Sequence, residues 1–359
     1  MSESGMSDMV QENAQLRHPT VRIWLLAVAA LIMVMVVVGG ATRLTDSGLS
    51  ITEWKPVTGI VPPLSAEGWA EEFGKYQKTP EYLKINKGMS LEQFKRIYWW
   101  EWGHRFLGRI IGLVFALPLL FFWLRGWIGP ALRNRLLIVL ALGAAQGGLG
   151  WFMVMSGLSV RVDVSQYRLA AHLGLAVLIF GTVLWLALEQ DKADDIVTGP
   201  PTMGRIMAAL LSGLIFVQIC LGGLVAGLKA GWTYNSWPLM NGALFPDGLY
   251  VYRPPWLSVF EDILTVQFNH RMMAYVIAAA VLVHLGLAVR RGLAERSLYL
   301  LAGGIFVQIG IGIWTLVTAV PLFLGLMHQL TAMIVFGLSL YHLHRIIRQD
   351  DQTFHSFSY

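Results

Sequence analysis

The chain has 359 residues, of which 55% are hydrophobic and 14% are charged, and its mean hydropathy is +0.57. This composition excludes an ordinary soluble globular domain and is typical of a protein embedded in a bilayer. Arginines in short loops explain the formal net charge of +5, so the charge indicates no nucleic-acid partner. The one cysteine, Cys220, excludes an intramolecular disulfide and a Cys-x-x-Cys motif.

Eight apolar runs follow one another along the chain, each with a length of about 20 residues, which is enough to cross a bilayer as a helix. They cover residues 22–41, 105–124, 134–155, 168–188, 205–227, 271–289, 297–318 and 321–343. The expected fold class is therefore an all-α polytopic membrane protein with eight transmembrane helices.

Arginines in the short loops indicate which side of the membrane each loop faces, because positively charged loops stay in the cytoplasm. They concentrate after the second, sixth and eighth runs, at Arg125, Arg133, Arg135, Arg290, Arg291, Arg296, Arg345 and Arg348. We therefore expect both termini in the cytoplasm and the long segments 42–104 and 228–270 outside. The acidic segment 189–204 departs mildly from this pattern.

An internal repeat relates the two halves of the chain. The recurring pairs are Gly39-Gly40 with Gly222-Gly223, Trp54 and Pro56 with Trp237-Pro238, Gln146 and Gly150 with Gln308 and Gly312, and His172 with His328. The repeat predicts two pseudo-symmetric four-helix bundles with the same orientation in the membrane. The expected parts are a cytoplasmic tail 1–21, an N-terminal half 22–188, a cytoplasmic linker 189–204, a C-terminal half 205–345 and a cytoplasmic tail 346–359.

The outer segment 42–104 is only partly interpretable from sequence. Thr79-Pro80-Glu81 predicts a helix start, and the amphipathic stretch 64–100 predicts short helices that lie at the membrane interface. A cap over a functional site and a plain spacer both remain open as interpretations of this segment.

Four histidines occupy equivalent places in the two halves. His104 and His270 stand where the second and sixth runs begin, and His172 and His328 lie a turn or two inside the fourth and eighth runs. The expected topology places all four near the outer leaflet. A histidine beside hydrocarbon is costly, and four in register across a repeat favour two ligand sites over interfacial polar residues.

Haem is the group that best fits two facing histidines in an apolar bundle. A structural zinc site needs four nitrogen or sulfur ligands, and a di-iron site needs more histidines and carboxylates than each half offers. Arg105 and Arg271 follow the ligands directly and are candidate partners of the haem propionates, and Arg43 is a further candidate.

Five further histidines have no partner in the repeat. His284 lies in the middle of an apolar run and is a candidate for a functional role. The others, His18, His342, His344 and His355, are expected to be cytoplasmic or terminal residues.

Glu101 is the one chemical difference between the two histidine motifs, because Gln267 occupies its place in the second half. Ser90-x-x-Gln93 predicts a capping box, and a helix from about residue 91 puts Glu101 and His104 on one face. Glu101 is therefore a candidate proton acceptor or donor, or a stabiliser of positive charge. The alternative is an interfacial salt bridge. Since an amide cannot titrate, the difference assigns chemistry to the first half and cofactor binding to the second.

These residues resemble those of the haem A synthase family, in its alphaproteobacterial and mitochondrial branch. The resemblance covers essentially the whole chain, including the outer motif from Gly39 to Pro56 and the four histidine motifs. It implies oxidation of the C8 methyl of haem O to a formyl group, giving the haem A of cytochrome oxidases. It further implies that His270 and His328 ligate a resident b-type haem and that His104 and His172 flank the substrate iron.

The same resemblance implies a membrane haem-dependent oxidoreductase that hydroxylates one methyl twice, after which the gem-diol loses water. Glu101 matches the functionally important carboxylate of the family. The paired outer cysteines of many bacterial members are absent, so no mechanism can use an outer thiol pair here. Whether one axial ligand leaves, or the porphyrin is oxidised and a cation is trapped by water, remains open.

The implied location is the bacterial inner membrane, with the haem sites near the periplasmic side. The implied partners are haem O synthase, cytochrome oxidase assembly proteins, an unidentified electron partner and the lipid bilayer. Two other functions remain as alternatives. A di-haem b-type electron-transfer cytochrome would place ligands near both membrane faces, and a non-enzymatic haem transport or assembly protein would not need Glu101.

Overall fold

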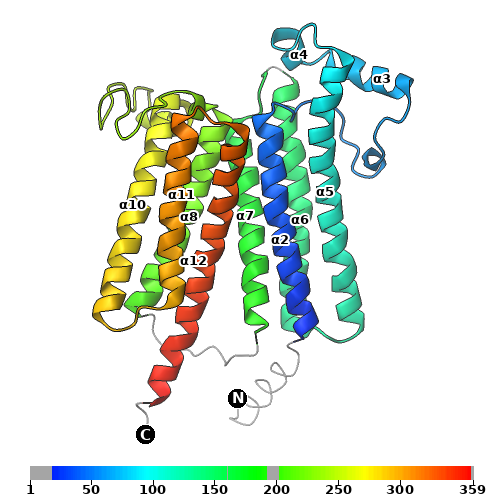
Figure 1. Ribbon diagram of the computed structural model, residues 1–359. Coiled ribbons are helices and arrows are strands. Elements are labelled where there is room, and N and C mark those ends of the chain that lie inside the picture. The colour runs from blue at the N-terminus through cyan, green and yellow to red at the C-terminus, as the bar shows by residue number, and fades with distance from the viewer. Residues whose placement is uncertain (1–17, 160, 192–201, 357–359) are drawn as a thin grey trace.

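The structure, a computed structural model, describes residues 18–159, 161–191 and 202–356. Within these residues eight helices are long and apolar enough to cross a membrane, and they stand side by side (Figure 1). They are α2 (Pro19–Leu44), α5 (Leu91–Leu124), α6 (Pro130–Leu158), α7 (Gln166–Glu189), α8 (Met203–Gly227), α10 (Ile263–Arg290), α11 (Arg296–Val317) and α12 (Leu322–Ser356). Each contains one of the predicted apolar runs or most of it, which confirms the all-α polytopic fold.

Shorter helical segments occupy the two long connections at one end of the bundle, which we call the long-loop end (Figure 1). They are η1 (Thr58–Ile60), α3 (Ala66–Tyr76), α4 (Pro80–Lys84), η2 (Ala230–Trp232), η3 (Pro255–Leu257) and α9 (Ser258–Glu261). The first helix begins and the last helix ends at the opposite, short-loop end (Figure 1).

The eight long helices pack as two groups of four. In the first group α2 contacts α5 and α7, and α6 completes a ring by contacting the same two helices. In the second group α8 contacts α10 and α12, and α11 completes the ring. Helix α5 therefore stands diagonally opposite α7, and α10 stands diagonally opposite α12. The groups meet where α7 packs on α8 and α2 packs on α12.

Two of the helix starts predicted from the sequence are confirmed by their capping hydrogen bonds. Ser90 Oγ accepts from the Gln93 backbone N–H at 3.3 Å, and Gln93 Oε1 accepts from the Ser90 N–H at 2.8 Å. This capping box lets α5 begin thirteen residues before His104 and carry Glu101 on a continuous helix. At α4, Thr79 Oγ1 accepts from the Tyr82 N–H at 3.2 Å.

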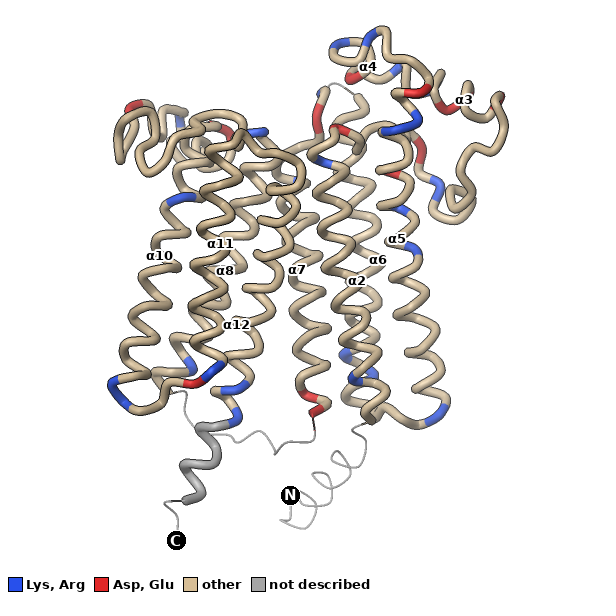
Figure 2. Tube along the Cα trace, viewed as in Figure 1, with Lys and Arg blue, Asp and Glu red and all other residues tan. Residues whose placement is uncertain are grey.

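The outward surface of the bundle is apolar between its ends. Leu117 and Leu120 on α5 and Leu282 and Val283 on α10 are all exposed. Lys and Arg lie mainly towards the two ends of the bundle (Figure 2). An apolar belt between charged ends is the surface that a bilayer stabilises. The predicted cytoplasmic arginines, among them Arg125 and Arg290, share the short-loop end, while the side of the membrane that this end faces stays a prediction.

The connection between α2 and α5 contains a packed aromatic cluster and is not irregular throughout. Tyr76, Phe94 and Tyr98 are buried together, and the rings of Trp69 and Phe73 pack against them. Burial of aromatic side chains is the main contribution that such a small cluster can offer to its stability. The aromatic cluster therefore ties α3 and α4 to the extended first turns of α5.

Glu81 makes the stability of this aromatic cluster depend on pH. Its side chain is buried and accepts a hydrogen bond from Tyr76 Oη at 3.0 Å. Burial raises the pKa of Glu81 from 4.5 to about 7. A carboxyl group whose pKa is raised by folding favours the folded state below its ordinary pKa, and this contribution is lost as the pH rises through the raised value.

We predict that hydrogen–deuterium exchange of residues 66–90 increases between about pH 5 and about pH 8, after correction for the intrinsic exchange rate. The physical reason is ionisation of Glu81 in its buried place. Glu81→Gln should flatten this dependence, whereas Glu67→Gln, at an exposed carboxylate of α3, should leave it unchanged. Equal slopes in the native chain and Glu81→Gln would contradict the assignment.

Candidate functional site

The four repeated histidines form two pairs, one inside each four-helix group. His104 on α5 and His172 on α7 belong to diagonally opposite helices of the first group. His270 on α10 and His328 on α12 are also diagonally placed, with ring centroids 6.4 Å apart and an interplanar angle of 79°. Diagonal helices are the two that face each other across the core, so each pair encloses the centre of its bundle.

In the first pair, each imidazole packs against a glycine of a neighbouring helix. A Cβ added to Gly39 of α2 would lie 3.0 Å from His104 Nε2. A Cβ added to Gly150 of α6 would lie 2.9 Å from His172 Cε1. These distances are shorter than van der Waals contact, so a side chain at either position would displace the ring.

The second pair repeats this arrangement with its own glycines. A Cβ on Gly222 of α8 would lie 3.3 Å from His270 Cε1, and one on Gly312 of α11 would lie 2.7 Å from His328 Cε1. All four glycines belong to the repeat seen in the sequence. The physical reason for that part of the repeat is therefore the room that each imidazole needs beside an adjacent helix.

Glutamine side chains hold the helix backbone at three of the histidines. Gln146 Nε2 donates to the His172 carbonyl at 2.9 Å, and Gln308 Nε2 donates to the His328 carbonyl at 2.9 Å. Gln218 Nε2 donates to the His270 carbonyl at 3.0 Å. A side-chain amide that bonds a helix carbonyl in an apolar core fixes the register of the two helices.

Haem fits both pairs by one unsatisfied buried atom in each, and it fits the second pair also by the spacing of the rings. The Nδ1 atoms of His172 and His270 are buried without a hydrogen-bond partner, which is rare for a polar atom unless it has another ligand. Two metal–nitrogen bonds of about 2 Å each, with half of each ring added, place the centroids of two axial imidazoles about 6–7 Å apart. The 6.4 Å between His270 and His328 lies in this range.

Glu101 has hydrogen-bond donors on both carboxylate oxygens. Its Oε1 accepts from Arg105 Nη2 at 2.6 Å, and its Oε2 accepts from Ser50 Oγ at 2.7 Å and from the Ile51 backbone N–H at 2.8 Å. The side chain is 2% exposed. The structure therefore contains the salt bridge that was the alternative interpretation of Glu101, with Arg105 as its partner. It adds an anchor for residues 50–51 that the sequence did not indicate.

Arg105 and Arg271 hold the long loops in the same way in both halves. Arg105 donates to the carbonyls of Ile51 and Glu53 at 2.8 and 3.0 Å. Arg271 donates to the carbonyls of Tyr234 and Ser236 at 2.6 and 2.9 Å. Each guanidinium thus bridges two carbonyls two residues apart. Propionate binding by these arginines stays a prediction, while their observed partners are loop carbonyls.

Gln267 shows why the two halves differ at this position. Its Nε2 donates to the carbonyls of Ala230 and Thr233, both at 2.6 Å, and its Oε1 accepts from Arg271 Nη2 at 2.8 Å. The loop of the second half offers acceptors to this side chain, whereas Ser50 and Ile51 offer donors to Glu101. An amide suits the first environment and a carboxylate suits the second.

Arg43 joins the two four-helix groups at the long-loop end. Its Nε and Nη2 donate to the carbonyls of Ala226 and Gly227 at 3.1 and 3.4 Å, at the C-terminus of α8. Its Nη1 also pairs with Asp46 at 3.1 Å and Asp163 at 3.4 Å. A cation beside the carbonyls at a helix C-terminus is favourable, so these contacts account for Arg43 without a propionate.

The family model described as cytochrome oxidase assembly protein, COX15-CtaA, matches residues 22–340 of the chain. The chain belongs to this family. It is 52% identical over 339 residues to a protein named heme A synthase from Parvibaculum lavamentivorans, covering 94% of this chain and 97% of the relative. The heme A synthase of Chelativorans sp. is 51% identical over 347 residues, covering 95% of each chain. That of Rhodopseudomonas palustris strain TIE-1 is 50% identical over 327 residues, covering 90% of this chain and 88% of the relative.

This member of the cytochrome oxidase assembly family has a third histidine pair, which the sequence analysis did not find. His284 and His342 are buried, with their Nε2 atoms 3.0 Å apart, and Ser297 Oγ lies 2.8 Å from His342 Nδ1. Each lies fourteen residues beyond His270 or His328 on the same helix, which is close to four turns and keeps the same face. This shared fourteen-residue spacing is the sequence pattern that could have indicated the third pair. His342 is buried in this pair, and the side of the membrane that it is nearer to stays a prediction.

We predict that Gly312→Ala removes roughly half of the bound haem, because the second of the two sites loses His328 as a ligand. The added methyl would stand 2.7 Å from His328 Cε1. Gly310→Ala on the same helix is the matched control, because no atom lies within 4 Å of a Cβ there. Haem per protein is measured by the pyridine haemochrome spectrum. Full haem retention in Gly312→Ala would contradict the proposed ligation.

Proposed function

We propose that this chain is a haem A synthase, a membrane oxidoreductase that converts the C8 methyl of haem O to the formyl group of haem A. The observation that carries the proposal is a pair of glycine-flanked imidazoles in each half of a chain about half identical to proteins named heme A synthase. The product would then serve cytochrome oxidase, which agrees with the description of the family.

We assign the resident b-type haem to His270 and His328 and the substrate iron to His104 and His172. The spacing of the second pair and its non-titratable neighbour Gln267 support a permanent cofactor there. When bound, the resident haem supplies one-electron redox chemistry. The protein contributes apolar walls and helix contacts that keep each imidazole in one orientation, since Gln146 and Gln308 hold the backbone at His172 and His328.

Glu101 is proposed as a positioning residue for the substrate half. It holds Arg105 and residues 50–51, and Arg105 in turn holds the carbonyls of residues 51 and 53. Because Glu101 and His104 share a face of α5, this clasp orders the outer segment next to the first histidine pair. Three donors also hold the carboxylate in one orientation, one turn from His104.

The proposed location is the bacterial inner membrane, with both termini in the cytoplasm and the long-loop end at the periplasmic side. The arginines of the short loops support this orientation. Haem O synthase, cytochrome oxidase assembly proteins and an electron partner are the proposed protein partners.

A di-haem electron-transfer cytochrome is the alternative that one observation favours. His284 and His342 would supply ligands near the second membrane face on the same two helices. Their Nε2 atoms, however, are hydrogen-bonded at 3.0 Å, and their ring centroids are 5.2 Å apart, closer than in the pair at His270 and His328. This spacing supports a direct hydrogen bond between the two imidazoles rather than a second haem site on α10 and α12.

We predict that cells lacking their own haem A synthase make formyl-bearing haem when they express this chain together with a source of haem O. Extracted haems are separated by chromatography and identified by mass. Cells without the haem O source are the control, and they should contain only the resident haem. Expression with intact haem b spectra but no formyl haem would exclude the enzyme function.

We also predict that Glu101→Gln retains bound haem but reduces the yield of formyl haem at least roughly tenfold. The physical reason is that the amide N–H₂ of the new side chain would face the Ile51 N–H, and an unsatisfied buried donor costs about 1–3 kcal/mol. Glu92→Gln is the matched control on the same helix, since Glu92 is exposed and pairs with Lys95 at 2.7 Å. Proteolysis of residues 45–60 reports whether the clasp has opened. Undiminished formyl haem in Glu101→Gln would remove this residue from the mechanism.

A further inference from the structure

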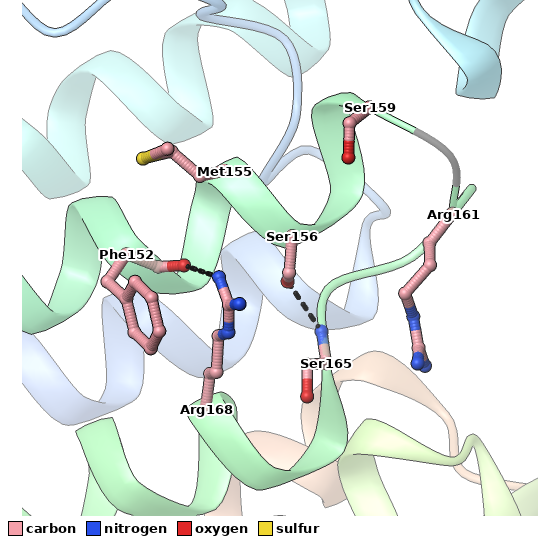
Figure 3. Close-up of a pocket in the computed structure, with 7 residues that line it drawn as sticks. All are labelled: Phe152, Met155, Ser156, Ser159, Arg161, Ser165 and Arg168. Carbon is pink, nitrogen blue, oxygen red and sulfur yellow. Dashed lines mark hydrogen bonds between the residues drawn. The ribbon is translucent and has the colours of Figure 1, made fainter.

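A pocket of about 460 Å³ with both polar and apolar lining lies at the long-loop end between α6 and α7. Arg161 and Arg168 line it, together with the hydroxyl-bearing residues Ser156, Ser159 and Ser165 (Figure 3). None of its lining residues is acidic. Neither arginine forms an ion pair with any residue that the structure describes. Two uncompensated cations beside several hydroxyl groups form the chemistry that binds an oxyanion.

The first turn of α7 strengthens the positive field in this pocket. Arg168 lies in that turn, which contains no acidic residue, although cations are unfavourable at a helix N-terminus. No side-chain hydrogen bond caps the helix, so the first N–H groups of α7 lack the usual acceptor. A bound anion would satisfy these N–H groups and would offset the charge of Arg168.

Ser165 is the buried group that points to a ligand. It is 9% exposed, and its backbone N–H donates to Ser156 Oγ at 2.8 Å. Its own hydroxyl lines the pocket, and no described residue hydrogen-bonds it. Figure 3 shows Ser156 and Ser165 between the two arginine side chains. A buried hydroxyl in a pocket that two arginines line can donate to an oxyanion bound there.

The apolar edge of the pocket determines which anion fits. Phe152 and Met155 also line it, and they are 50% and 47% exposed. Arg168 stacks on Phe152, with its guanidinium carbon 3.6 Å from the ring centroid, and donates to the Phe152 carbonyl at 2.5 Å. The pocket lies at the end of two transmembrane helices, where lipid headgroups begin. An anion with attached hydrocarbon matches these surroundings, whereas a freely soluble anion would leave Phe152 and Met155 uncovered.

We propose that this pocket is a phospholipid site, in which Arg161, Arg168 and Ser165 bind the phosphate and Phe152 and Met155 contact the acyl chains. The proposal does not depend on the reaction assigned to the histidine pairs. It places an ordered lipid one helical turn from His172, since Arg168 precedes that residue by four positions on α7. The lipid would close the seam between α6 and α7 beside the first histidine pair.

The test uses the haem-loaded full chain, delipidated in an uncharged detergent and titrated with phosphatidylglycerol. Native mass spectrometry counts the bound lipid. We expect one retained lipid, and a loss of affinity of about tenfold or more in the double variant Arg161→Gln/Arg168→Gln, because two charge-assisted contacts are removed. Arg161→Lys/Arg168→Lys keeps the charges but not the bidentate geometry. Its affinity for the lipid should lie between those of the native chain and the double Gln variant.

Lys84→Gln/Arg96→Gln is the matched control, since it removes the same charge from exposed residues at the same end of the molecule. The spectrum of haem held by His270 and His328 verifies that each variant is folded. Uncharged diacylglycerol should not bind.

Four results would overturn the proposal. The first is an equal loss of lipid affinity in the control and the double variant, and the second is unchanged lipid affinity in the double variant. The third is complete displacement of the lipid by inorganic phosphate. The fourth is a double variant that loses substrate haem but still binds the lipid. The third would assign the pocket to free phosphate, and the fourth would assign it to porphyrin carboxylates.

Discussion

The close approach of a helix backbone to each imidazole is the constraint on which the two sites depend. Gly39, Gly150, Gly222 and Gly312 each leave the space that one histidine ring occupies. Glycine inside a helix is destabilising by about 1 kcal/mol relative to alanine in water, so its use at four such positions has a packing cause. With the rings placed on diagonal helices, the space between them can take a planar group, and the remaining two helices of each ring form its walls.

The long loops are held over these sites by one arrangement used twice. An arginine that follows the histidine bridges two loop carbonyls, and the residue four positions before it completes the contact. That residue is Glu101 where the loop presents donors and Gln267 where it presents carbonyls. The difference between the halves therefore has a local cause in the direction of the hydrogen bonds that each loop offers, and it leaves a carboxyl group beside His104 only. Substitution of Glu101 consequently tests the loop and the chemistry together, which is why loop proteolysis is measured with the product.

The features predicted correctly from the sequence are those that depend on neighbours in the chain. The capping box at Ser90 joins residues three apart, and the apolar runs are set by consecutive residues. The loop partners of Glu101, Ile51 and Ser50, are fifty and fifty-one positions away, and the bond between His284 and His342 spans fifty-eight. No local pattern specifies such contacts, although the fourteen-residue spacing on α10 and α12 was visible in hindsight. The pocket at Arg161 and Arg168 likewise needs two helices to meet.

By itself the sequence determined the eight helices, because a bilayer accepts only helices of limited length. It also predicted two halves with one histidine pair in each, because a histidine beside hydrocarbon is conspicuous. Only the tertiary structure decided which groups these histidines and Glu101 contact. The reason is that side-chain partners depend on helix rotation and on the loop that returns over each bundle, and these are set by packing between distant segments. The repeat identified equivalent positions, while the folded loops gave Glu101 and Gln267 opposite hydrogen-bonding partners.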